Sequence, residues 1–143
     1  MTNFKNELIN KFSLTPTPFF YYDLELLDKT LESLKSAAGK YGYQVHYALK
    51  ANANSTILKQ IRKYGFGADC VSGNEVSRAA ETGFPGDKIV FAGVGKSDEE
   101  IKTGLEHNIH SFNCESAQEL EVIDQIAGSC KKSPRLLCAL IPM

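Results

Sequence analysis

Lys50 is the residue of this chain best placed for covalent chemistry. It follows the mostly apolar run 45–49 and precedes Asn52, Asn54 and Ser55, so we expect a strand that ends at the lysine. Barrel and open α/β folds assemble their active sites at the carboxyl ends of parallel strands. A neutral amine there can form an imine with a cofactor aldehyde, provided that burial or a nearby cation lowers the lysine pKa from about 10.4. The alternative is a lysine whose stem simply packs at a strand end.

Asp69 is the second candidate site residue. It lies in the next predicted strand, 68–72, and in a barrel it would face the same mouth as Lys50. A turn-forming carboxylate ahead of Ser72 is an equally good interpretation. Glu75 falls three residues after Ser72, and this spacing favours a helix cap over a catalytic role.

The run 93–97, Gly-Val-Gly-Lys-Ser, resembles half of a phosphate-binding loop. A full P-loop requires a glycine five residues before its second glycine, and that position is Val90. The missing glycine argues against nucleotide binding and favours a structural role for Lys96 and Ser97.

Short strands and helices alternate along the chain. Pro16 and Pro18 separate the N-terminal tail, residues 1–14, from the rest of the chain. An aromatic strand is predicted at 19–22, and Asp23 is expected to cap the next helix. Further strands are predicted at 45–50, 68–72, 89–92 and 109–113, and helices at 24–39, 57–65, 75–81, 98–107 and 116–127. This alternation predicts right-handed βαβ units and a parallel sheet, either closed into a barrel or open and doubly wound.

Composition narrows the class of protein. The 143 residues are 43% hydrophobic and carry a net charge of -1, with lysine and arginine dispersed, so neither nucleic acid nor an anionic membrane is an expected partner. The N-terminus has no signal-peptide pattern and the apolar stretches are strand-sized, which predicts a cytoplasmic protein. No metal site is expected from the four cysteines and three histidines, because none has the spacing of a ligand set.

Several blocks together resemble a known family. They are YALKAN at 47–52, GADCVSGNE at 67–75, KIVFAG at 88–93 and FNCES at 112–116. In this order and spacing the chain is similar to the N-terminal part of the diaminopimelate decarboxylase family, over roughly residues 15–135. That family belongs to the pyridoxal-phosphate enzymes with an alanine-racemase-like barrel, which also include ornithine and arginine decarboxylases.

The resemblance implies a fold, a cofactor and roles for two residues. Lys50 would hold pyridoxal 5'-phosphate as an internal aldimine, and Asp69 would lie near the cofactor. Residues 15–143 would form the N-terminal portion of a parallel (β/α)8-type barrel, with four or five of its eight strands, because a complete barrel takes about 250 residues. The family's β domain would be absent. Members of the family are expected to be homodimers with a small amino-acid substrate.

The implied activity is decarboxylation of meso-2,6-diaminopimelate to L-lysine. Related activities remain open, namely decarboxylation of ornithine, arginine or carboxynorspermidine, or racemisation. A third interpretation is a non-catalytic, truncated product. Residues 137–143 read Leu-Cys-Ala-Leu-Ile-Pro-Met where the family commonly has Leu-Arg-Ile-Asn-Pro-Asn-Val, and one permitted coding of this end yields the family's strand after a single-base shift. We therefore hypothesise a frameshift near residue 137 and expect the 143-residue chain alone to be inactive.

Overall fold

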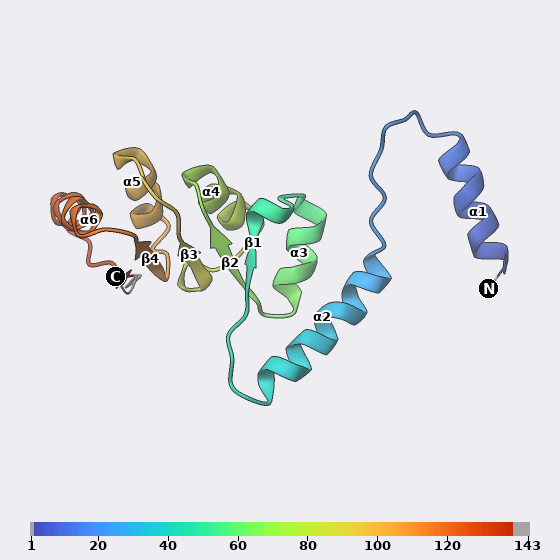
Figure 1. The fold of residues 1–143 in the computed structure, drawn as a ribbon, viewed down its shortest axis with the longest axis horizontal. Helices are drawn as coiled ribbons and strands as arrows, with labels where there is room; N and C mark the ends of the chain where they lie inside the picture. The colour runs from blue at the N-terminus through green and yellow to red at the C-terminus, as the bar shows by residue number, and fades with distance from the viewer. Residues whose placement is uncertain (1, 139–143) are drawn as a thin grey trace.

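The computed structural model describes residues 2–138 and shows strands alternating with helices (Figure 1). In chain order the elements are α1 (Thr2–Ser13), α2 (Leu24–Gly39), β1 (His46–Ala48), the 3-10 turn η1 (Leu49–Ala51), α3 (Ser55–Lys63), β2 (Gly67–Cys70), α4 (Gly73–Glu81), the 3-10 turn η2 (Gly86–Lys88), β3 (Ile89–Phe91), α5 (Asp98–Glu106), β4 (Ser111–Cys114), α6 (Ala117–Ser129) and β5 (Leu136–Cys138).

The five strands form one parallel sheet in sequence order, β1-β2-β3-β4-β5. In the register Ala48 pairs with Asp69, Asp69 with Val90, and Val90 with Ser111. Helices α4, α5 and α6 pack on one another in the order of their strands (Figure 1). Each crossover returns the chain to the same end of the sheet, as βαβ units require. The prediction of a parallel barrel portion with four or five strands is confirmed, and the number is five.

The two faces of the sheet differ in chemistry. Toward the helices it presents apolar side chains that are almost completely buried, including Phe91 and Phe112. The opposite face, which would line the interior of a barrel, carries Asp69, Ser111 and Asn113. Because side chains alternate along a strand, one register places all the polar groups on this inner face.

The core lies between the sheet and its helices. Phe112 on β4 is 0% exposed, and its ring packs against Phe91 at a centroid distance of 6.0 Å. A side chain on Gly104 of α5 would come within 2.5 Å of the Phe112 ring, so only glycine lets the helix approach the strand this closely. The Phe112 ring therefore sets the spacing between α5 and the sheet.

The N-terminal region differs from the sequence prediction at one point. Residues 19–22, predicted to be a strand, are extended but belong to no strand, and Phe20 is 88% exposed. A strand needs a neighbour to pair its backbone, and these residues do not border the described sheet (Figure 1). The tail predicted at 1–14 contains helix α1, which touches the aromatic segment through Phe12 and Tyr21, with centroids 5.0 Å apart. The division of the chain at residue 15 stays a prediction.

The prediction that Asp23 caps the following helix is confirmed. Its carboxylate accepts the Leu26 N–H at 3.0 Å, at the start of α2. Asp28, one turn later, accepts hydrogen bonds from Gln60 and from the Tyr64 hydroxyl, and so ties α2 to α3.

Candidate active site

Lys50 lies immediately beyond the carboxyl end of β1, within η1, and is exposed. The strand ends at Ala48 and does not reach Lys50 as predicted, because Leu49–Ala51 form the 3-10 turn. The Tyr47 hydroxyl closes this turn by donating to the Asn52 carbonyl at 3.3 Å, and Asn54 caps α3 by accepting the Thr56 N–H at 2.9 Å. The asparagines after the lysine therefore serve the strand-to-helix connection, and the lysine amine is left accessible.

Asp69 occupies the neighbouring strand and faces the interior of the half barrel. Its Cα pairs with that of Ala48, two residues before Lys50, so both candidate residues lie toward the same end of the sheet. The Oδ1 atom is buried and has no hydrogen-bond partner among the described residues. The alternative role as a turn-forming carboxylate is not supported, because the Ser72 hydroxyl and the Glu75 carboxylate make the hydrogen bonds at that turn. A buried carboxylate oxygen without a donor is costly unless something binds to it.

His46 lies at the opposite, amino end of the inner face and fills space beside Gly67. A Cβ on Gly67 would come within 2.2 Å of the His46 ring. Burial lowers the pKa of His46, the charge of His110 lowers it further, and Asp69 opposes them by raising it. This half-buried histidine therefore packs beside Gly67, at the end of the strand away from Lys50.

Three Ser-x-x-Glu motifs order the loops at the carboxyl ends of the strands. Ser72, Ser97 and Ser116 each accept the backbone N–H of a glutamate three residues later, namely Glu75, Glu100 and Glu119. Only the second is a full capping box, with the Glu100 carboxylate returning to the Ser97 N–H at 3.0 Å. At Ser116 only half of a capping box forms, since the Glu119 carboxylate accepts the Glu115 N–H at 2.8 Å instead of the Ser116 N–H.

Glu100 also joins two neighbouring βα units. Its Oε1 accepts the Gly73 N–H at 2.9 Å, so the start of α5 holds the start of α4. The backbone donors of Gly73 and Ser97 lower the pKa of Glu100 from its ordinary value of 4.5. The ionised Glu100 carboxylate therefore contributes its full share to the stability of the fold at any pH above 4.5. This contribution is lost as the pH falls through the lower pKa that Glu100 has in the folded state.

We predict that the free energy of unfolding of Glu100→Gln depends less on pH in the acid range than that of the unsubstituted chain. The unsubstituted chain should lose free energy of unfolding below pH 4.5 more steeply than the variant, because protonation breaks the hydrogen bonds to the Glu100 carboxylate. Urea unfolding followed by circular dichroism between pH 6 and pH 3 measures this slope. Glu121→Gln, at an exposed position of α6, is the matched control. Equal slopes for the two variants would contradict the prediction.

The Lys96 amine is engaged by groups of the protein itself, which is consistent with the structural role expected for this residue. Its side chain is 2% exposed, and its Nζ donates to the carbonyls of Gly93 and Asn113 at 2.8 Å and to Glu119 Oε1 at 2.9 Å. Sequence reasoning missed this ion pair, although the repeated Ser-x-x-Glu motif marked Glu119.

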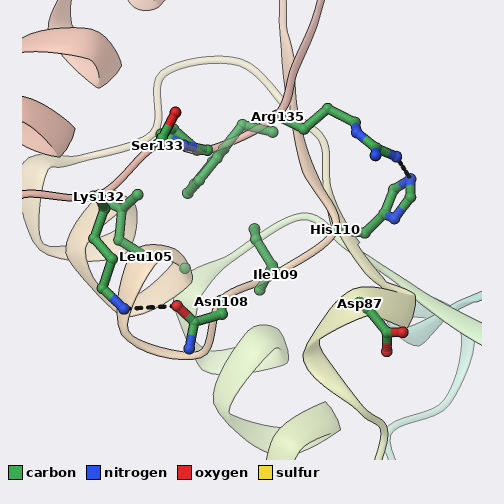
Figure 2. A pocket seen from close by; sticks show the side chains of 11 residues that line it. Asp87, Leu105, Asn108, Ile109, His110, Lys132, Ser133 and Arg135 are labelled. Carbon is green, nitrogen blue, oxygen red and sulfur yellow. Dashed lines mark hydrogen bonds between the residues drawn. The ribbon is translucent and has the colours of Figure 1, made fainter.

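The largest cavity described lies at the other end of the sheet from Lys50. It has a volume of about 470 Å³ and lies beside the segments that lead into β4 and β5. Figure 2 shows Lys132 bonded to Asn108 on one side of it, and Arg135 bonded to His110 on the other. Barrel enzymes use this amino end for stability and the carboxyl end for chemistry. Lys50 and Asp69 therefore mark the site better than the cavity volume does.

Other reactive groups do not extend the candidate site. Burial raises the pKa of Cys70 to about 12, so this thiol is inert at neutral pH. Within residues 2–138 no three histidine, cysteine or acidic side chains gather as a metal site would require. In the same range no helix is both long and apolar enough to cross a bilayer.

Comparison with known proteins agrees with this geometry. The family described as pyridoxal-dependent decarboxylase, pyridoxal binding domain, matches residues 25–138. Diaminopimelate decarboxylase of Bacteroides thetaiotaomicron is 54% identical over 125 residues, which cover 87% of this chain and 32% of that protein. The chain thus spans about a third of the length of the curated relatives it matches.

Solved structures give the same result. A diaminopimelate decarboxylase of Helicobacter pylori complexed with L-lysine superposes with a TM-score of 0.82 at 40% identity, over 90% of this chain and 33% of that one. Arginine decarboxylase of Paramecium bursaria Chlorella virus superposes with a TM-score of 0.79 at 18% identity, over 96% of this chain and 36% of that one. At this low identity the likeness shows the fold alone. With this family match over most of its length, the chain belongs to the family described as pyridoxal-dependent decarboxylase, pyridoxal binding domain.

Proposed function

We propose that this chain is the cofactor-binding part of a decarboxylase that acts on meso-2,6-diaminopimelate and yields L-lysine and carbon dioxide. The observation that carries the proposal is that the exposed Lys50, just beyond β1, and Asp69 on β2, whose Oδ1 is buried without a partner among the described residues, lie toward the same end of the sheet. The identity of 54% with a diaminopimelate decarboxylase supports this substrate over ornithine, arginine or carboxynorspermidine.

The residues present fit pyridoxal phosphate. Lys50 would hold it through its amine, and the unpartnered Asp69 Oδ1 would place a negative charge beside it. When bound, the cofactor supplies an electron sink for the electron pair left when the carboxylate departs. The inner face also carries the neutral side chain of Asn113, whose Oδ1 accepts a hydrogen bond from the buried Ser111 hydroxyl at 3.5 Å.

Lys50 would have a second role in the reaction. Its amine, when it is not bonded to the cofactor, would be the candidate group to deliver a proton to the α-carbon that loses the carboxylate. The exposure of Lys50, beyond the end of β1, leaves it room for both roles. The proposal also includes a cytoplasmic location and a homodimer for the full-length enzyme.

The test is saturable labelling of Lys50 by pyridoxal phosphate. The purified chain is titrated with the cofactor, the absorbance is recorded, and borohydride is added to fix the bond between the cofactor and the amine. Peptide mass spectrometry should find the label on Lys50 and a saturable dose dependence, both lost in Lys50→Ala. Lys59→Ala, at another exposed lysine on α3, is the matched control and should label normally. Labelling spread over several lysines without saturation would overturn the proposal.

A parallel assay separates cofactor binding from catalysis. Carbon dioxide released from meso-diaminopimelate, ornithine and arginine is measured with the loaded chain. Release from meso-diaminopimelate alone supports the full proposal. Specific labelling of Lys50 without release from any of the three would assign the chain, by itself, to cofactor binding only.

A further inference from the structure

The strongest feature that the proposed function leaves unused is the buried pair of Lys96 and Glu119. Their side chains are 2% and 10% exposed, and their charged atoms are 2.9 Å apart. The Lys96 ammonium also lies 5.3 Å from the centroid of the Phe91 ring. Burying two charges is costly and brings little net stability compared with apolar side chains of similar size, so such a pair calls for another reason.

The pair fixes the carboxyl end of β4. Lys96 Nζ donates to the backbone carbonyl of Asn113 at 2.8 Å, and Glu119 accepts the N–H of Glu115 at 2.8 Å. The peptide groups on both sides of Cys114 are thus held by charged partners. Burial by itself raises the pKa of Glu119, but the Glu115 N–H and the hydrogen bond and charge of Lys96 outweigh it, so Glu119 stays ionised at neutral pH.

Fixing this backbone fixes the direction of the Asn113 side chain. Phe112 and Cys114 on either side of it are buried against the helices, so Asn113 points to the inner face. There it follows Ser111 by two residues, and Ser111 is in register with Val90, which is in register with Asp69. Asn113 therefore lies two residues closer to the carboxyl end of the sheet than the level of Asp69. Lys50 lies at the same level as Asn113, because it follows Ala48, the partner of Asp69, by two residues.

We infer that Asn113 is a hydrogen-bonding residue for pyridoxal phosphate on the inner face, and that Lys96 and Glu119 are positioning residues that act through it. The inference rests on the proposed function, because it concerns the same face as Lys50 and Asp69. An amide suits this place, since it donates and accepts hydrogen bonds without adding another charge to the inner face that carries the Asp69 carboxylate. The ion pair keeps the strand end from moving when the group binds.

The experiment measures the cofactor concentration that half-saturates labelling of Lys50. Asn113→Ala should raise it about three- to tenfold, the range expected for one hydrogen bond. The double variant Lys96→Met with Glu119→Gln removes both charges but keeps the side-chain shapes, and should raise it by a similar factor. The variant with all three substitutions should need about the same cofactor concentration for half-saturation as Asn113→Ala, because the three residues act through one chain of contacts. The absorbance maximum of the bound cofactor should shift in the same variants.

Controls separate this effect from general destabilisation. Lys102→Met with Glu99→Gln removes an exposed ion pair of 2.6 Å on α5 and should leave half-saturation and absorbance unchanged. Circular dichroism verifies that each variant is folded. Unchanged half-saturation in Asn113→Ala, or additive effects in the triple variant, would overturn the inference while leaving the proposed function intact. Absence of saturable Lys50 labelling in the unsubstituted chain would overturn both.

Discussion

Lys96→Met alone should destabilise the fold by about 3–5 kcal/mol, the cost of leaving one partner of a buried ion pair uncompensated. The Glu119 carboxylate, 10% exposed, would lose its cation and one hydrogen bond while water could not replace them fully. The Asn113 and Gly93 carbonyls would lose a donor in the same step. Urea unfolding at neutral pH, followed by circular dichroism, measures the change in the free energy of unfolding.

Adding Glu119→Gln to Lys96→Met should recover most of this loss, because the double variant buries no charge. Lys102→Met, in a pair whose side chains are 44% and 82% exposed, should leave the unfolding midpoint unchanged. The two variants thus make the same Lys→Met change in a buried and in an exposed ion pair, so the difference between them measures the effect of burial. Equal midpoints for Lys96→Met and Lys102→Met would show that the buried pair adds nothing to stability.

Phe112→Ala should cost about 3–5 kcal/mol, the range for removing a large aromatic side chain from a core. The ring is 0% exposed, packs on Phe91, and fills the space that Gly104 leaves on α5. Against a typical stability of about 5–15 kcal/mol, such a loss should be visible as a large drop in the urea midpoint.

The matched control for this substitution is Phe20→Ala. Phe20 is 88% exposed, so its removal should change the free energy of unfolding by no more than about 0.5 kcal/mol. A loss in Phe112→Ala as small as that in Phe20→Ala would mean that the core between α5 and β4 is not packed as described.

Local patterns in the sequence predicted the elements of the fold well. The Ser-x-x-Glu spacings marked the starts of helices, and Asp23 marked the start of α2, because an N-cap is a contact between residues that are close in sequence. The segment at 19–22 was predicted wrongly as a strand. Its aromatic composition suits a strand, but pairing depends on a neighbour that local sequence does not reveal.

For the candidate site the sequence alone singled out Lys50 and Asp69, through residue type, strand ends and the resemblance of their motifs, and it determined the alternation that builds a parallel sheet. Only the tertiary structure decided that Asp69 Oδ1 is buried without a partner among the described residues, that Lys96 pairs with Glu119, and that Asn113 shares the inner face. These facts depend on contacts between residues up to 23 positions apart and on strand register. Burial and pairing of that kind arise from how the elements pack, and no local spacing encodes them.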